Sequence, residues 1–141
     1  RMSSRSVYSW TALISGFTHF GDGWKAIGML ECMQKDGFQP NHFTLVSLIK
    51  ACGSIGCLQE GRKIHALVRN KGLDSDIFIS TSLISMYSKC GSLRESEDVF
   101  NELLDCNVVS WNAMLSVYVE HGHNEKAMRL FRQLVESVGT L

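Results

Sequence analysis

The stretch Ser9–Phe17, SWTALISGF, decides the fold, because a near copy, SWNAMLSVY, returns at Ser110–Tyr118. In the first copy, apolar residues recur at helical intervals, which predicts a helix with one apolar face: they are Trp10, Leu13, Ile14 and Phe17. The apolar positions barely change between the copies, whereas Thr11 becomes Asn112. The sequence therefore indicates a repeat with a constant packing face and a variable polar position.

The same pattern runs through the whole chain. Glycines that follow the first helix of each unit are separated by 35, 35 and 31 residues: Gly21, Gly56, Gly91 and Gly122. The same offsets connect apolar residues at Leu13, Leu48, Leu83 and Met114, and small residues at Ala26, Gly61, Ser96 and Ala127. They also connect Leu30, His65, Phe100 and Phe131, where His65 is the exception. A fixed period of this length is typical of stacked repeats.

The repeat divides the chain into four units: residues 7–41, 42–76, 77–107 and 108–141, the last of them incomplete. Residues 1–6 are interpreted as the tail of an upstream unit, so we expect a piece of a longer protein. Each unit reads as two helices joined by a turn at its glycine, with the small residue where the second helix approaches the first. Because one helix pair cannot bury its apolar face alone, the pairs must stack. We therefore predict an all-α fold, a right-handed superhelical solenoid of helix-turn-helix repeats on the tetratricopeptide plan.

Composition adds limits on function. The chain has 141 residues, with 14 Lys and Arg against 14 Asp and Glu, so net charge alone gives no basic footprint for a polyanion. No apolar run is long enough to span a membrane. The five cysteines form no secreted-type framework, which favours reduced, packed thiols.

Several stretches resemble the pentatricopeptide repeat (PPR) family, whose unit is 35 residues long. They are VYSWTALISG at 7–16, DGFQPN at 36–41 and LISMYSKCG at 83–91. The alternation of unit lengths resembles the plant PLS subclass. LIKAC at 48–52 and GRKIHA at 61–66 are similar to its long unit, and the 31-residue unit is similar to its short one.

The resemblance implies a function. Proteins of this family bind single-stranded RNA in mitochondria or chloroplasts, one base per unit, and the PLS subclass mostly guides C-to-U editing and related mRNA processing. The resemblance therefore implies organelle RNA as the partner, joined by proteins of an editing complex, with no cofactor and no enzymatic activity in this chain. A transit peptide would lie outside it.

In the family, the base is chosen by the fifth residue of a unit together with its last residue. The resemblance assigns this base-reading role to Thr11 with Asn41, Val46 with Asp76, Thr81 with Asn107, and Asn112. By the family's code Thr with Asn favours adenine, and Asn at the first of these places favours a pyrimidine. Val46 has no hydrogen-bonding group, so the second unit should discriminate weakly. The expected RNA is A-n-A-pyrimidine.

The second residue of each unit stacks on the bases in this family. Here those residues are Tyr8, Phe43, Phe78 and Val109. For Phe43, packing in the core is the open alternative. Lys89 stands where the family often places a phosphate contact, but the corresponding residues are His19, Ser54 and Glu120, so we expect weak RNA binding from this chain alone.

Other chemistry finds little support. Cys52, Cys57 and His65 lack the paired spacing of a zinc site, so packing is the preferred interpretation. Cys90 has no evident activating base, and His121 and His123 are interpreted as a solvated turn. The deaminase signature is missing from this chain.

Two rival interpretations remain open: a protein-binding solenoid, and spacer repeats. Polar residues at three of the four fifth places favour an RNA reader. Charges such as Arg62 are interpreted as solvated helix faces. We also expect self-association through exposed ends of the solenoid.

Overall fold

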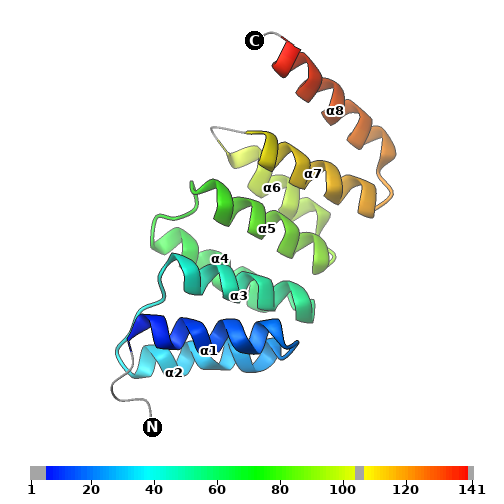
Figure 1. Cartoon of the computed structure of the whole chain (residues 1–141). Coiled ribbons are helices and arrows are strands. Elements are labelled where there is room, and N and C mark those ends of the chain that lie inside the picture. Colours follow the sequence, from blue (N-terminus) through cyan, green and yellow to red (C-terminus); the bar gives the residue numbers. More distant parts are fainter. Residues whose placement is uncertain (1–5, 104–106, 140–141) are drawn as a thin grey trace.

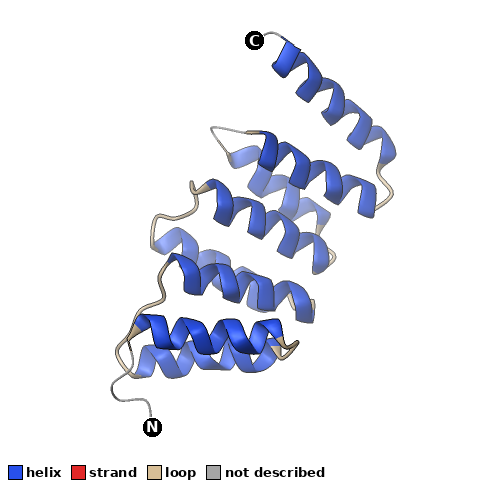
Figure 2. Cartoon of the chain, in the orientation of Figure 1, coloured by secondary structure: helices blue, strands red, loops and turns tan. Residues whose placement is uncertain are grey.

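The computed structural model describes residues 6–103 and 107–139 of the chain. This part holds eight α-helices and no strand (Figure 2). The helices are α1 (Val7–His19), α2 (Gly23–Lys35), α3 (His42–Ile55), α4 (Leu58–Asn70), α5 (Ile77–Lys89), α6 (Leu93–Glu102), α7 (Val108–Glu120) and α8 (Asn124–Gly139). The prediction of an all-α helical-repeat solenoid is confirmed.

The helices form two rows (Figure 1). The first helices of the units pack side by side in one row, α1 on α3, α3 on α5 and α5 on α7. The second helices lie behind them, and each packs on the first helix of its own unit and on that of the next: α2 on α1 and α3, α4 on α3 and α5, α6 on α5 and α7. Helix α8 packs on α7.

The apolar positions of the repeat form the core. Ile14, Ile49 and Ile84 occupy the same place in successive units, and all three are buried. The small residues Ala26, Gly61, Ser96 and Ala127 are also buried, as their packing role predicted. At this place the Ser96 hydroxyl donates to the Ile84 carbonyl over 2.8 Å, so the polar member of the set is satisfied inside the core.

A left-handed glycine turns the chain between the two helices of each unit. Gly21, Gly56, Gly91 and Gly122 have φ of 83°, 68°, 84° and 75°. A residue with a Cβ rarely adopts this conformation, so glycine at this place is a requirement of the turn. Because the turns recur, the first helices all begin at the same edge of the solenoid.

None of the helices in the part of the chain that the structure describes combines the length and apolarity needed to cross a membrane.

Candidate nucleic-acid interface

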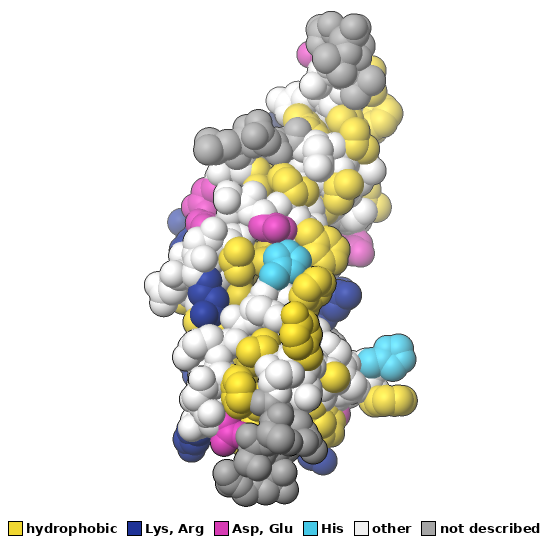
Figure 3. Space-filling view, turned by 60° about the vertical axis from the view of Figure 1, so that its left-hand side comes forward, with side chains coloured by type: hydrophobic (Ala, Val, Ile, Leu, Met, Phe, Trp, Pro, Cys, Tyr) yellow, Lys and Arg dark blue, Asp and Glu magenta, His cyan; other side chains and the backbone are white. Residues whose placement is uncertain are grey.

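A row of exposed apolar side chains follows the edge where the first helices begin. Its members are Tyr8, Phe43, Phe78 and Val109, with exposed fractions of 77%, 66%, 54% and 57%; we call them the stacking row. Figure 3 shows this edge from the front, with hydrophobic side chains gathered along it. Large apolar side chains held in solvent mark binding surfaces when they lie together. Phe43 is mostly exposed and is therefore not a core residue.

The last residue of each unit caps the first helix of the next unit. The Asn41 Oδ1 accepts from the Thr44 N–H at 2.9 Å, and the Asn107 Oδ1 accepts from the Ser110 N–H at 3.0 Å. The Asp76 Oδ1 accepts from the Ile79 N–H at 3.0 Å. An N-cap oxygen satisfies one of the free N–H groups of the helix start. The cap commits the amide oxygen of each Asn and leaves its NH2 group as the free donor.

Sequence reasoning assigned these residues to base reading and missed their role as helix caps. The signal was present in the sequence. Asn41 and Asn107 each precede an apolar helix and are followed three residues later by Thr44 and Ser110, whose hydroxyls accept from the backbone N–H of the cap residue at 3.2 and 3.0 Å.

In the first unit, a chain of hydrogen bonds joins the two expected reading residues. Thr11 Oγ1 lies 2.5 Å from Thr44 Oγ1, and Thr44 Oγ1 donates to Asn41 Oδ1 at 2.9 Å. Thr11 comes from α1, while Thr44 lies in α3. The structure thus brings Thr11 and Asn41 into one polar network at the junction between the two units.

The third unit is organised differently. The Thr81 hydroxyl donates to the Phe78 carbonyl at 3.0 Å, one turn back in its own helix. Ser110 is buried, and its hydroxyl donates to the Asn107 carbonyl at 2.8 Å. Asn107 and Asn112 are both exposed. Their carboxamides are therefore accessible from solvent at the start of α7.

The second unit has no polar reader at its fifth place. Val46 is buried, with 7% of its surface exposed. Asp76 Oδ2, the carboxylate oxygen that does not cap α5, lies 3.3 Å from His42 Nε2. The weak discrimination expected of this unit stays a prediction.

Lys89 is exposed in the last turn of α5. It lies eleven residues after Phe78, which corresponds to about 16 Å along the helix. The structure therefore does not place Lys89 beside the stacking row but at the opposite end of the same helix. At the corresponding place in α7, Glu120 accepts a hydrogen bond from the Ser88 hydroxyl at 3.3 Å.

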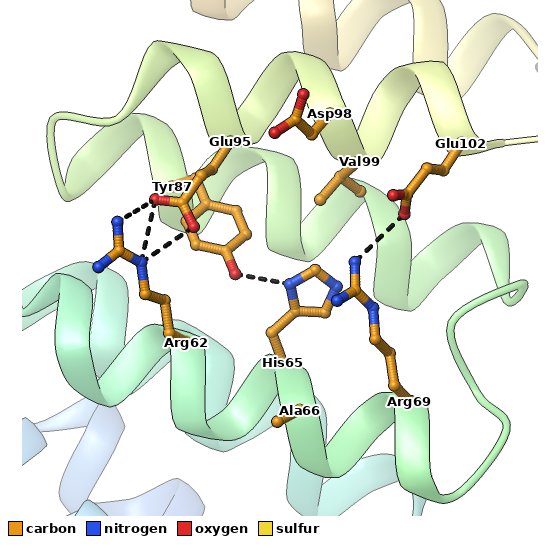
Figure 4. A pocket seen from close by; sticks show the side chains of 9 residues that line it. All are labelled: Arg62, His65, Ala66, Arg69, Tyr87, Glu95, Asp98, Val99 and Glu102. Carbon is orange, nitrogen blue, oxygen red and sulfur yellow. Dashed lines mark hydrogen bonds and ion pairs between the residues drawn. The ribbon is translucent and has the colours of Figure 1, made fainter.

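On the other side of the molecule, a cleft lies between α4 and α6 (Figure 4). Its charged side chains pair across the cleft: Arg62 donates from Nε and Nη2 to the Glu95 carboxylate at 3.0 and 2.8 Å, and Arg69 donates to Glu102 at 3.3 Å. Arg62 therefore joins successive second helices, which corrects its interpretation as a merely solvated charge. Its hydrogen bonds lower the pKa of Glu95.

His65 is buried at the floor of this cleft. Its Nδ1 lies 2.6 Å from the Tyr87 hydroxyl, and desolvation lowers its pKa. His65 is the exception among the apolar residues of its repeat place, and Tyr87 is the partner that satisfies it. This pair explains a departure from the repeat as local packing.

The cysteines near the first turn of the second unit are packing residues in this structure. Cys52 is buried, and burial raises the pKa of its thiol to about 12. The Cys90 thiol lies 3.7 Å from the Cys52 carbonyl. A thiol that stays protonated at neutral pH is a poor nucleophile. Within residues 6–103 and 107–139, no group of three or more His, Cys, Asp or Glu is arranged to hold a metal ion.

Comparison with known proteins finds the same repeat. A model of the PPR repeat family matches residues 5–54, and a PPR repeat model matches residues 43–73, 78–108 and 109–137.

Among relatives, the chain is 40% identical to the pentatricopeptide repeat-containing protein At4g30700 of Arabidopsis thaliana over 94% of the chain and 17% of the relative. It is 35% identical to the protein CRR2, chloroplastic, of the same plant, over 95% of the chain and 21% of the relative. It is 36% identical to At3g24000, mitochondrial, also from this plant, over 94% of the chain and 21% of the relative. The chain thus spans about a fifth of the length of these relatives.

Among solved structures, the fold is similar to the pentatricopeptide repeat protein PPR10, crystallised in complex with an 18-nt psaJ RNA element. The TM-score is 0.52 and the sequence identity 20%, over 94% of this chain and 25% of PPR10. Together with the helix pairs described above, the repeat matches over most of the chain show that it belongs to the pentatricopeptide repeat family.

Proposed function

We propose that this chain binds single-stranded RNA, with one base assigned to each of the units 7–41, 42–76, 77–107 and 108–141. The observation that carries the proposal is the stacking row, which exposes three aromatic rings and a valine at a regular place along one edge. Stacking of a base on such a ring contributes about 1–3 kcal/mol and tolerates any base. The row therefore supports affinity rather than sequence choice.

Sequence choice would come from the polar groups beside the row. In the first unit, the Asn41 cap leaves an NH2 donor free, and Thr11 adds a hydroxyl from α1. A donor suits the N1 acceptor of adenine, whereas guanine presents N–H donors on the same edge. This reasoning supports adenine at the first place, and Asn107 with Thr81 extends it to the third. The proposed RNA remains A-n-A-pyrimidine, with Asn112 at the last place.

The names of related proteins support a cellular compartment for this function. Curated relatives are named as chloroplastic or mitochondrial proteins, which supports action on organelle RNA. Membership of the PLS subclass and a part in C-to-U editing belong to the same proposal. The chain would then be a non-enzymatic binding segment of a longer protein, with editing-complex proteins as further partners.

The test exploits the cap. Asn41→Asp keeps an N-cap oxygen, as Asp76 does naturally in α5, but replaces the free donor with an acceptor. We expect the variant to lose preference for adenine over guanine at the first RNA place, because a carboxylate accepts from guanine and cannot donate to adenine. Binding is measured by NMR titration with A-n-A-C and G-n-A-C at low and moderate salt.

The third RNA place is the internal control. Asn41→Asp should leave discrimination between A-n-A-C and A-n-G-C unchanged, and Asn107→Asp should show the opposite pattern. Thr11→Asn should move the first place toward a pyrimidine. Equal effects of Asn41→Asp at both places would contradict unit-by-unit reading, and no binding to any RNA would contradict the proposed function itself.

A further inference from the structure

The stacking row is interrupted between its second and third members by a histidine. His42 is the first residue of α3, and its ring lies against both neighbouring phenylalanines. The ring centroids are 5.4 Å from Phe43, with the planes at 75°, and 6.2 Å from Phe78, with the planes at 17°. The imidazole is therefore nearly parallel to Phe78, at a distance typical of stacked aromatic pairs.

A second contact holds the imidazole in this position. His42 Nε2 lies 3.3 Å from Asp76 Oδ2. Asp76 is itself fixed, because its other oxygen caps α5 through the Ile79 N–H. Only 32% of the His42 side chain is exposed. The ring is thus held by a stack on one side and by an anchored carboxylate on its edge.

The other units have no such group. Their first residues are aliphatic: Val7, Ile77 and Val108. A base bound between Phe43 and Phe78 would need the space in which the His42 ring now lies, 5.4 Å from the Phe43 ring and 6.2 Å from the Phe78 ring. Two planar rings cannot occupy one stacking position, so base and imidazole exclude each other.

We propose that the His42 ring fills the base position of the second unit. The base at the second RNA place would therefore contribute least to the affinity of the chain for RNA. The inference rests on the RNA binding proposed above and names how one unit of that surface is regulated. The burial of Val46 is a separate contribution, since it removes the polar reader but not the stacking ring. The His42 ring removes the stacking position itself, because it lies between Phe43 and Phe78.

The test removes one base at a time. RNAs of the A-n-A-C type carry an abasic nucleotide at a single place, and their affinities for the wild-type chain and for His42→Val are measured by NMR titration. Valine is chosen because it stands at this place in the first and fourth units. In the wild type, an abasic second place should change the Kd by less than about two-fold, whereas an abasic third place should weaken binding about five-fold or more.

In His42→Val, removing the base at the second place should weaken binding as much as removing the base at the third place. The intact RNA should bind His42→Val more tightly than the wild type by the same factor. Ile77→Val is the matched control, because it changes the first residue of the next unit and keeps the imidazole. Its Kd changes with the abasic RNAs should equal those of the wild type. Thermal unfolding confirms that each variant is folded.

The His42 ring protons give a readout that needs no affinity. In the free chain they should be shifted upfield by the Phe78 ring current, and this shift should persist at saturating RNA, because the imidazole keeps the base position of the second unit. Unshifted protons in the free chain, an equal abasic penalty at both places in the wild type, or an unchanged profile in His42→Val would each overturn the inference. If the protons are shifted but no RNA binds, the proposed function fails first and the inference falls with it.

Discussion

A single polar pair, His65 with Tyr87, shows how this chain tolerates a departure from its repeat. The other units place Leu30, Phe100 or Phe131 where His65 stands. The imidazole is buried, and its 2.6 Å contact with the Tyr87 hydroxyl satisfies one nitrogen. A buried polar group without a partner costs about 1–3 kcal/mol, so the pair must be treated as a unit.

This pair predicts a pH-dependent stability. Desolvation lowers the pKa of folded His65 below its value in the unfolded chain, near 6.5. As the pH falls below this value, the unfolded chain takes up the proton first, so the free energy of unfolding must fall with it. Thermal unfolding between pH 7.5 and 5 should show this loss of stability. The pKa values of Glu95 and Glu97 are lowered, so these carboxylates take up protons, and change the stability, only at more acidic pH.

The double variant His65→Phe with Tyr87→Phe should be less sensitive to pH over the same range, because the titrating group is gone and no partner is left unpaired. Tyr87→Phe alone should cost about 1 kcal/mol at pH 7.5, since it strands the imidazole. An equally steep pH profile in the double variant would show that other histidines cause the effect.

The second helices lie close to the first because of small residues at their contact points. In α2, a Cβ on Gly23 would lie 2.7 Å from the Ile55 Cγ2 and 3.0 Å from the Ala51 carbonyl oxygen of α3. In α4, the three atoms nearest to a Cβ on Gly61 would all belong to the Met86 side chain, with its Sδ and Cε at 2.9 Å. Backbone cannot yield, whereas the end of a methionine side chain can.

The two glycines should therefore respond differently to the same change. Gly23→Ala should lower the free energy of unfolding by about 1–3 kcal/mol through overpacking against α3. Gly61→Ala should be neutral to within about 1 kcal/mol, because the Met86 side chain moves aside and alanine is the better helix former. Urea unfolding of the two variants is the measurement, and each variant is the control of the other. Equal losses would contradict the argument.

The whole solenoid is stabilised by contacts between neighbouring repeats. Its last helix has a neighbour on one side and therefore makes the fewest such contacts. Helix α8 packs on α7 and exposes Met128, Phe131 and Val135. At the other end of the described chain, Phe20 and Trp24 are exposed. A stack of helix pairs leaves its terminal apolar faces uncovered unless another surface meets them.

We predict that the isolated chain associates through the apolar face of α8. Light scattering should give a mass that rises with protein concentration. Phe131→Glu combined with Val135→Lys should give a constant monomer mass, because charges replace the apolar contact without changing the net charge. Gln133→Glu changes an exposed residue of the same helix outside this apolar set and should leave the association in place. A monomer mass at every concentration in the unaltered chain would contradict the prediction.

The repeat and the class of fold could be predicted from the sequence, because they depend on local patterns. The spacing of Ile14, Ile49 and Ile84, the turn glycines and the small residues such as Ala26 each act within one helix or one turn. These patterns predicted the helix pairs and their stacking, and the structure confirms an all-α repeat solenoid. The reading, stacking and phosphate residues stay predictions, although the structure leaves the stacking row exposed.

What the sequence could not show are contacts between units. Thr11 meets Thr44 across α1 and α3, Arg62 meets Glu95 across α4 and α6, and each pair is 33 residues apart. The stack of His42 on Phe78 and the burial of Val46 likewise depend on how one unit is set against the next. A period in the sequence defines which residues are equivalent, but the rotation and distance between units arise from packing of all their side chains together. The sequence by itself therefore determined the helices and the family, while the surroundings of each proposed base position followed from the packed solenoid.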